Sequence, residues 1–282
     1  MAVAGVLDLF RVRPKGLIGD DGKMSLADHF RELRARLMKS VLALVVATIV
    51  SFFFYDQLIE LVTGPYNQAR EMLDDKTRTE IFVSGVGGGL MIQLKLCALS
   101  GVIVSSPVWL YQIWAFVLPG LHRNERKWTM VFVAIAGPLF AAGVALGYYV
   151  LPKGLRVLID FTPAGMQNLN DFNDFFSFIT RMLLVFGLSL EIPFFVVLLN
   201  LAGVVSGRAL GRYRPWIVLG TFVFAAVATP STDPISMLFL AVPMLLLFLL
   251  SEAIARLVDR RRGRGVEQQW DDDEASPLPP AR

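Results

Sequence analysis

The sequence has few residues that could carry out catalysis or hold a metal ion. It contains one cysteine and two histidines in 282 residues. It has no His-Glu-x-x-His sequence, no Gly-x-Ser-x-Gly sequence and no clustered metal ligands. The lone Cys97 allows neither an intramolecular disulfide nor a thiol-based metal site. We therefore expect a protein that is not an enzyme and has no metal site.

The chain also lacks a strong net charge and an apolar signal core near its N-terminus. Its formal charge is only +3, and its basic residues form short clusters beside apolar runs, which indicates membrane orientation rather than nucleic-acid binding. The N-terminal segment carries Asp8, Asp20 and Asp21 and has no apolar core with a small-residue cleavage site. We expect no nucleic-acid partner and no removable signal peptide.

Apolar sequence, in contrast, is abundant. Hydrophobic residues make up 55% of the chain, and its mean hydropathy is +0.56. A membrane-crossing helix needs about 20 mostly apolar residues. The composition therefore predicts an all-α integral membrane protein with six transmembrane helices, at residues 41–62, 89–118, 128–151, 176–202, 215–230 and 234–252.

Arginine and lysine clusters flank alternate ends of these runs. They precede the first run and follow the second, fourth and sixth, which predicts that both termini are cytoplasmic. The intervening loops are poorer in basic residues and are assigned to the outside by alternation. The acidic, proline-bearing C-terminal segment is expected to be disordered. We divide the chain into a cytoplasmic extension (1–24), a six-span membrane domain (25–256) and a cytoplasmic tail (257–282).

The last two apolar runs are short. A helix of about 15 residues covers about 22 Å, which is less than a hydrocarbon core of about 30 Å. The turn sequence Thr229-Pro230-Ser231-Thr232-Asp233-Pro234 joins the two runs into one helical hairpin. Either the bilayer is thinner beside this hairpin or partner helices shield it.

Two carboxylates lie among arginines at the predicted cytoplasmic ends of the spans. Glu32 lies on the polar side of an amphipathic helix that starts at a capping sequence from Ser25, runs on the membrane surface and leads into the first span. Arg36, four residues later, is placed to form an ion pair with Glu32. Glu125 follows the exit of the second span. These carboxylates could receive a ligand with two guanidinium groups, whereas the simpler interpretation is a solvated anchoring face.

The second span carries aromatic residues near its cytoplasmic exit. Trp109, Tyr111, Trp114 and Phe116 are expected to be mainly interfacial belt residues. Phe116 could also pack against the apolar part of a bound peptide.

One carboxylate falls near the middle of a span. Glu191 must be neutral, paired or hydrated there, because an unpaired charge in hydrocarbon is costly. Its nearest candidate partners are Ser189 and the carbonyl group that Pro193 leaves without a donor. A functional role is the usual meaning of such a residue, and the alternative is a polar bond between helices.

Taken together, these segments resemble the TatC family, whose members are the receptor and core membrane subunit of the twin-arginine protein translocase. The resemblance runs from about residue 25 to residue 256. It is carried by His29-Phe30-Arg31-Glu32-Leu33-Arg34-Ala35-Arg36-Leu37, by Ser106-Pro107 through Tyr111-Gln112-Ile113-Trp114-Ala115-Phe116 to Pro119-Gly120-Leu121, by Glu125-Arg126, by Phe186-Gly187-Leu188-Ser189-Leu190-Glu191-Ile192-Pro193, and by Thr229-Pro230 with Asp233.

The resemblance implies a six-span, glove-shaped protein that recognises the twin-arginine motif of signal peptides. It implies a multimeric complex with TatA-like and TatB-like single-span partners, which moves folded cargo with the proton-motive force and without a bound cofactor or nucleotide. By the same resemblance, the signal-peptide site contains Glu32, Glu125, Phe116 and Arg34, the intramembrane polar residue is Glu191, and the functional residues of the outer face are Pro65 and Asp233.

The chain departs from the family at two places, and other function classes remain open at this point. Met237 stands where some relatives have a glutamine, and Arg181 in the fourth span matches no motif. A proton-coupled solute transporter with Glu191 as the proton carrier is the main alternative. An intramembrane enzyme is a third class, but the sequence offers no plausible pair of nucleophile and base.

Overall fold

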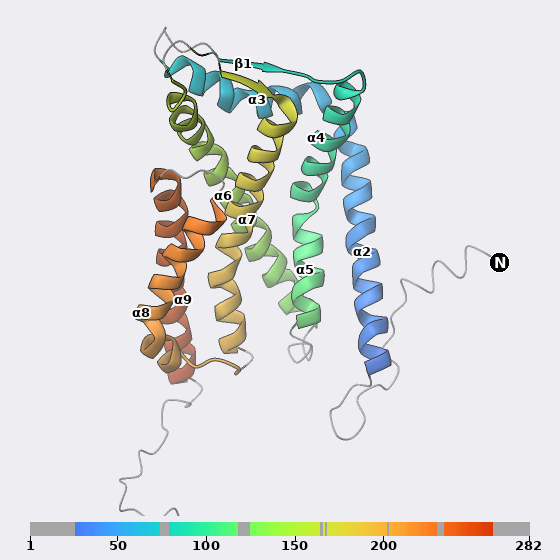
Figure 1. Cartoon of the computed structure of the whole chain (residues 1–282). Coiled ribbons are helices and arrows are strands. Elements are labelled where there is room, and N and C mark those ends of the chain that lie inside the picture. Colours follow the sequence, from blue (N-terminus) through green and yellow to red (C-terminus); the bar gives the residue numbers. More distant parts are fainter. Residues whose placement is uncertain are drawn as a thin grey trace, which may run out of the picture.

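The structure is a computed structural model that describes residues 26–73, 79–117, 125–163, 166, 168–201, 203–229 and 234–261. Helices dominate it, as the composition predicts (Figure 1). The elements, in chain order, are α2 (Leu26–Phe52), α3 (Tyr55–Glu71), β1 (Thr79–Phe82), α4 (Gly88–Val104), α5 (Ser106–Val117), α6 (Glu125–Asp160), β2 (Asn168–Asp171), α7 (Phe172–Leu201), α8 (Gly207–Ala228) and α9 (Pro234–Arg261).

Four described helices are long and apolar enough to cross a membrane. These are α2, α6, α7 and α9, and α4 with α5 makes a fifth span if the bent pair counts as one. The expected fifth run lies in α8, whose apolar part is too short to be counted with them by the same measure. Length and composition therefore support up to five of the six predicted spans among the described residues, and the crossing by α8 stays a prediction.

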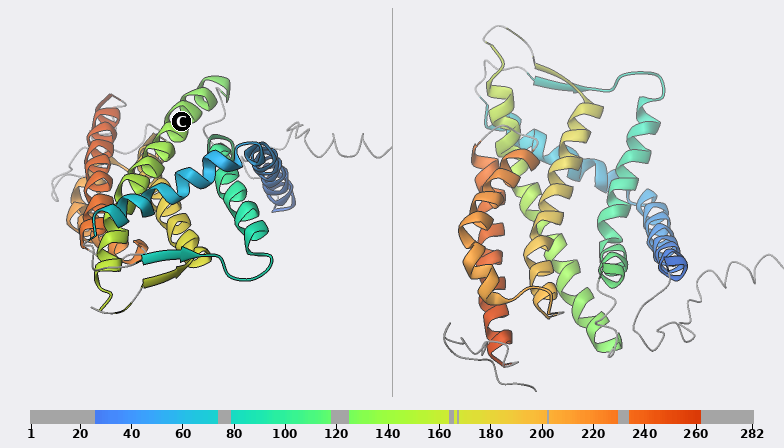
Figure 2. Two further views of the ribbon diagram at one scale, coloured as in Figure 1. Left: turned by 90° about the horizontal axis from the view of Figure 1, so that it is seen from above. Right: turned by 60° about the horizontal axis from the view of Figure 1, so that its bottom comes forward.

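The first span does not lie where the hydropathy placed it. The run 41–62 is interrupted by a turn at Phe53 and Phe54, so the apolar helix is α2, which starts at Leu26. The amphipathic segment is therefore the first part of α2 rather than a separate surface helix. Helix α3 lies across the upper end of the bundle, as Figures 1 and 2 show, because its polar residues disfavour the hydrocarbon core.

The second span is bent. The axes of α4 and α5 differ by 57°, and the break lies at Ser105, directly before Ser106-Pro107. Pro107 has no backbone N–H and cannot continue the hydrogen bonds of α4. The indole nitrogen of Trp109 donates to the Val102 carbonyl at 2.9 Å, which satisfies an acceptor at the bend. A proline next to the break therefore accounts for the bend of the second span.

Two short strands lie at the upper end, where the sequence predicted only outer loops. β1 and β2 pair in parallel, with Thr79 opposite Asn168 and Phe82 opposite Asp171. The Tyr66 hydroxyl lies 2.9 Å from the Thr79 hydroxyl and ties α3 to this pair. Ser84 donates a hydrogen bond to the half-buried Asp171, and this bond is the main reason that the pKa of Asp171 is lowered. The upper end is thus a small folded cap.

Helices α6 and α7 approach each other closely. A Cβ atom at Gly143 would lie 2.5 Å from the Phe186 carbonyl oxygen, and one at Gly187 would lie 2.7 Å from the Phe140 ring. Gly147, four residues after Gly143, faces the Phe186 side chain. Small residues at this spacing let two membrane helices pack backbone to backbone. This contact fixes α7, which carries Glu191, against α6.

The last two helices form the expected hairpin. Figure 1 shows α8 and α9 side by side, with the upper end of the pair well below the strands. Both helices extend beyond their apolar runs, because α8 starts at Gly207 and α9 continues to Arg261. The last five residues of α9 thus belong to the segment that the sequence assigned to the tail.

Candidate functional site

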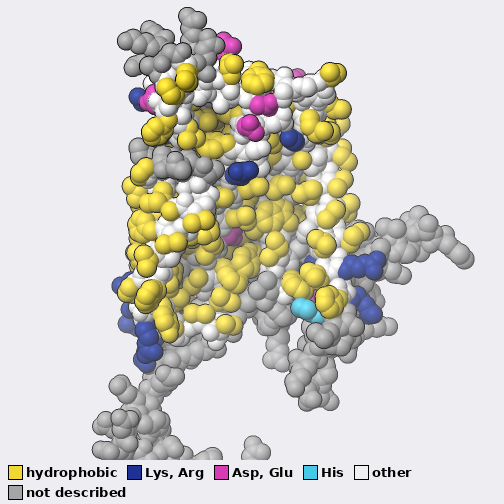
Figure 3. Space-filling view, in the orientation of Figure 1, with side chains coloured by type: hydrophobic (Ala, Val, Ile, Leu, Met, Phe, Trp, Pro, Cys, Tyr) yellow, Lys and Arg dark blue, Asp and Glu magenta, His cyan; other side chains and the backbone are white. Residues whose placement is uncertain are grey.

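The helix ends next to the basic clusters of the sequence lie at the lower end of the bundle in Figure 1. The start of α2, the end of α5, the start of α6 and the end of α9 all lie there. Figure 3 shows apolar side chains over the middle of this face and Lys or Arg at both lower corners. The described basic residues that flank alternate ends of the apolar runs therefore lie at one end of the structure.

Glu32 is paired at this end as the sequence predicted. The Arg36 Nε donates to Glu32 Oε1 at 2.9 Å, and an Nη of the same guanidinium also contacts that oxygen. The side chains of Arg36 and Glu32 are only 16% and 18% exposed. Glu32 thus already holds one guanidinium group, which shows that its surroundings suit this kind of partner.

Phe116 lies beside the same turn of α2. Its ring stacks on that of His29, with the centroids 4.5 Å apart and the planes at 24°. His29 precedes Glu32 by three residues, so the two side chains lie on the same side of α2. Phe116 of α5 is therefore held against the turn of α2 that carries Glu32.

Of the other two residues expected in this site, the structure describes the side chain of Arg34 and only the backbone of Glu125. Arg34 is exposed on α2. Glu125 is the first residue of α6, which places its backbone at the same end, while its side chain lies outside the described part of the structure. Ser25, the expected cap of the first helix, and Asp233 also lie outside the described residues.

Glu191 is buried in α7. It is 3% exposed, and neither carboxylate oxygen has a hydrogen-bond partner among the described residues. The Phe140 backbone lies near, without the geometry of a hydrogen bond. The Ser189 hydroxyl donates to the Val185 carbonyl at 2.5 Å instead. Neither partner suggested from the sequence therefore binds this carboxyl group.

Pro65 lies at the opposite end of the bundle, inside α3 rather than in an irregular loop. It is buried and leaves the Leu61 carbonyl without its helical donor. The Tyr148 hydroxyl on α6 donates to that carbonyl at 2.9 Å. Pro65 therefore shapes the contact between α3 and α6, which sequence reasoning could not foresee.

The aromatic residues of α5 pack between helices. Trp109 meets the Phe140 ring of α6 edge to face at 5.5 Å, and Trp114 lies 4.4 Å from the Phe195 ring of α7. Their assignment as belt residues is therefore incomplete, because these rings hold α5 against its neighbours. Aromatic pairs of this kind contribute about 0.5–1.5 kcal/mol beyond their burial.

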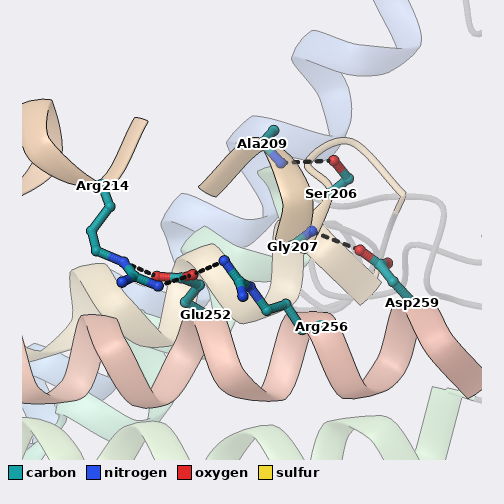
Figure 4. Close-up of polar contacts among 7 residues, drawn as sticks. All are labelled: Ser206, Gly207, Ala209, Arg214, Glu252, Arg256 and Asp259. Carbon is teal, nitrogen blue, oxygen red and sulfur yellow. Dashed lines mark hydrogen bonds and ion pairs between the residues drawn. The ribbon is translucent and has the colours of Figure 1, made fainter. Parts of the chain in front are cut away.

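The sequence did not lead us to predict the ionic cluster around Glu252. Figure 4 shows Glu252 of α9 between two arginines. Arg214 of α8 donates to both its oxygens, at 2.9 and 2.7 Å, and Arg256 contacts Oε1 at 2.6 Å. Glu252 is 2% exposed. Its spacing to Arg256 equals that of Glu32 to Arg36, so the same signal was available.

Asp259 closes the lower end of the hairpin. Its Oδ2 accepts from the Gly207 backbone N–H at 2.6 Å, and its Oδ1 accepts from the buried Asn200 amide at 3.0 Å (Figure 4 shows the first bond). A negative charge at the start of α8 also suits the helix dipole. This cluster joins α7, α8 and α9 at one point.

Comparisons with known proteins agree with this arrangement. The family model of the Sec-independent protein translocase protein (TatC) matches residues 28–243. The chain is 40% identical over 269 residues to Sec-independent protein translocase protein TatC of Frankia casuarinae, covering 92% of this chain and 74% of the relative. It is 36% identical over 243 residues to the chloroplastic protein of Arabidopsis thaliana, covering 86% and 69%.

A solved structure is similar as well. The crystal structure of the twin-arginine translocase receptor TatC aligns with a TM-score of 0.64 and 27% identity. The alignment covers 82% of this chain and 100% of that one.

Proposed function

This chain belongs to the TatC family of Sec-independent protein translocase proteins, and we propose that it is the receptor that recognises twin-arginine signal peptides within its translocase. The family consists of membrane subunits of a protein export system rather than enzymes. That membership favours protein translocation over the proton-coupled solute transporter.

The contact between Glu32 and Arg36 carries this proposal. In this contact Glu32 accepts a guanidinium group, which is the kind of partner that a twin-arginine motif would bring, and this supports the proposal. An arriving arginine would share Glu32 with Arg36 or displace it. An exchange of one guanidinium for another costs little, because the number of ion pairs is conserved.

Two further groups support a peptide site at this end of the bundle. Phe116, stacked on His29, offers an apolar surface about one helical turn from Glu32. Glu125 begins α6 at the same end and would supply the carboxylate for the second arginine. Arg34, exposed on α2, would stand close to the peptide backbone or to its acidic residues.

The remaining roles follow from placement and family. We assign the basic end to the cytoplasm and the cap of β1 and β2 to the outside of the cytoplasmic membrane. TatA-like and TatB-like single-span proteins would assemble with the chain, and the proton-motive force would drive transport. Glu191 would contact an inserted peptide or partner at depth, while Pro65 and Asp233 would act on the outer side.

The test is binding of a labelled signal peptide to the full chain in lipid nanodiscs. A peptide with Arg-Arg should bind more tightly than the same peptide with Lys-Lys, since lysine lacks the planar fork of donors. Glu32→Gln and Glu125→Gln should each weaken Arg-Arg binding by about tenfold, which corresponds to about 1.4 kcal/mol.

The matched control is Glu80→Gln, an exposed carboxylate of β1 at the opposite end. It should leave both affinities unchanged. Equal binding of the two peptides to folded wild-type protein, or no loss in either glutamate variant, would contradict the receptor role. Uptake of a solute by the protein alone in liposomes would favour the proton-coupled solute transporter instead.

A further inference from the structure

The lower end of the α8–α9 hairpin gathers positive charge. All six arginines of the two helices are exposed, and we call them the arginine base. The same two helices contain two carboxylates, Glu252 and Asp259, both of which are buried. Four positive charges therefore remain over these described residues. The members of the arginine base are Arg208, Arg212, Arg214, Arg256, Arg260 and Arg261.

The buried carboxylates order this base without covering it. Glu252 holds Arg214 and Arg256, whose side chains are still 47% and 49% exposed. A guanidinium has five N–H donors, and Arg214 directs only its Nε and one Nη at Glu252. Gly211 makes room for this arrangement, because a Cβ there would lie 2.1 Å from an Nη of Arg256. The outer donors are therefore held in place for another acceptor.

We propose that the acidic run Asp271–Glu274 of this chain's own tail binds the arginine base. All four residues of this run are acidic, so their charge matches the four positive charges that the two buried carboxylates leave over on α8 and α9. Carboxylates are the acceptors that guanidinium donors match best, through paired N–H···O bonds. The run also lies outside the residues that the family model matches.

The tail is long enough to reach this surface. Helix α9 ends at Arg261, itself part of the arginine base, and nine residues separate it from Asp271. A flexible chain of about ten residues spans about 17 Å on average. The rise from Glu252 to Arg261 along α9 is about 14 Å. A linker of matching reach gives a local concentration in the millimolar range.

The same donors would also suit the phosphate of an anionic lipid. The tail has the advantage of being attached at the base itself, whereas a lipid must be recruited from the leaflet. Each exposed ion pair contributes only about 0.2–1 kcal/mol, so several must act together and salt must weaken them. The bound tail would neutralise the base and shield it from the anionic membrane surface.

Crosslinking of the full chain tests this proposal. In a Cys97→Ala background, Ala275→Cys marks the tail and Val204→Cys marks the base; Val204 is 68% exposed in the turn before α8. Phe30→Cys, 65% exposed at the same end on α2, is the matched control. With a short bis-maleimide at low salt, the Val204→Cys pair should react about fivefold faster than the Phe30→Cys pair.

The difference should disappear at high salt and when Asp271, Asp272, Asp273 and Glu274 are replaced by their amides. Equal rates for the two pairs, or a preference that survives neutralisation of the tail, would overturn the proposal. A preference that is present in zwitterionic nanodiscs but absent in anionic ones would show that lipid headgroups occupy the arginine base. That result would overturn the proposal that the tail binds the base in an anionic membrane. Peptide binding plays no part in the measurement, so the proposal stands or fails independently of the receptor role.

Discussion

Glu191 and Glu252 are two buried carboxylates on neighbouring helices with opposite surroundings. They are 3% and 2% exposed. Ser251, next to Glu252, donates at 2.8 Å to the carbonyl of Pro193, two residues beyond Glu191 toward the lower end, so Glu252 lies nearer that end than Glu191 does. Glu252 holds two guanidinium groups, whereas Glu191 has no hydrogen-bond partner among the described residues.

The difference teaches that burial alone does not assign a role to a membrane carboxylate. A carboxylate with two fixed cations is satisfied inside the chain, and its loss leaves those cations unpaired. A carboxylate without a partner gains nothing from the folded chain alone, so its retention points to a proton or to a group from outside. We therefore expect stability to depend on Glu252 and function to depend on Glu191.

The largest effect is expected for Glu252→Gln. This variant removes the charge that Arg214 and Arg256 share, and breaking such a pair costs about 3 kcal/mol. The free energy of unfolding in detergent micelles measures the loss. Arg260→Gln, which changes an exposed arginine two turns further along α9, is the control and should stay within about 0.5 kcal/mol. A loss below 1 kcal/mol for Glu252→Gln would show that the two arginines are satisfied by water instead.

A smaller loss is expected for Gly211→Ala. The added Cβ would displace the Arg256 guanidinium and crowd Glu252 Oε1 at 3.1 Å, at a cost of about 1–2 kcal/mol. Gly220→Ala on the same helix is the matched control, because a Cβ there meets no atom within 4 Å. The control should gain up to about 1 kcal/mol from helix propensity. Similar results for both variants would mean that the ion cluster does not depend on this close approach.

Tyr148→Phe tests how much stability depends on a fixed partner when the acceptor is an uncharged carbonyl. The variant removes the hydroxyl that donates to the Leu61 carbonyl and should lower the free energy of unfolding by about 1 kcal/mol. Tyr149→Phe, at the next position of α6 and 60% exposed, should change it by less. Loss of equal size in both would indicate a general effect of removing a hydroxyl from this helix.

Hydropathy and charge spacing predicted most of the helices and the ion pair of Glu32 with Arg36. They could not separate α2 from α3, because Phe52, Phe53 and Phe54 keep the run apolar through a turn. The strands were not predicted, because the four residues of β1 form a strand by pairing with β2, which lies far along the chain. The partners of Glu252 were missed for a similar reason, as Arg214 lies 38 positions away.

The smallest effect on stability is expected for Glu191→Gln. No hydrogen bond within the described chain is lost, so the free energy of unfolding should change by less than about 0.5 kcal/mol. Docking of an Arg-Arg peptide should also persist, because Glu191 lies ten residues, or about 15 Å, from the lower end of α7. Export of a folded reporter and the crosslinking depth of the peptide should change instead. A destabilisation as large as that of Glu252→Gln would show that Glu191 has a structural partner and would remove the contrast between the two carboxylates.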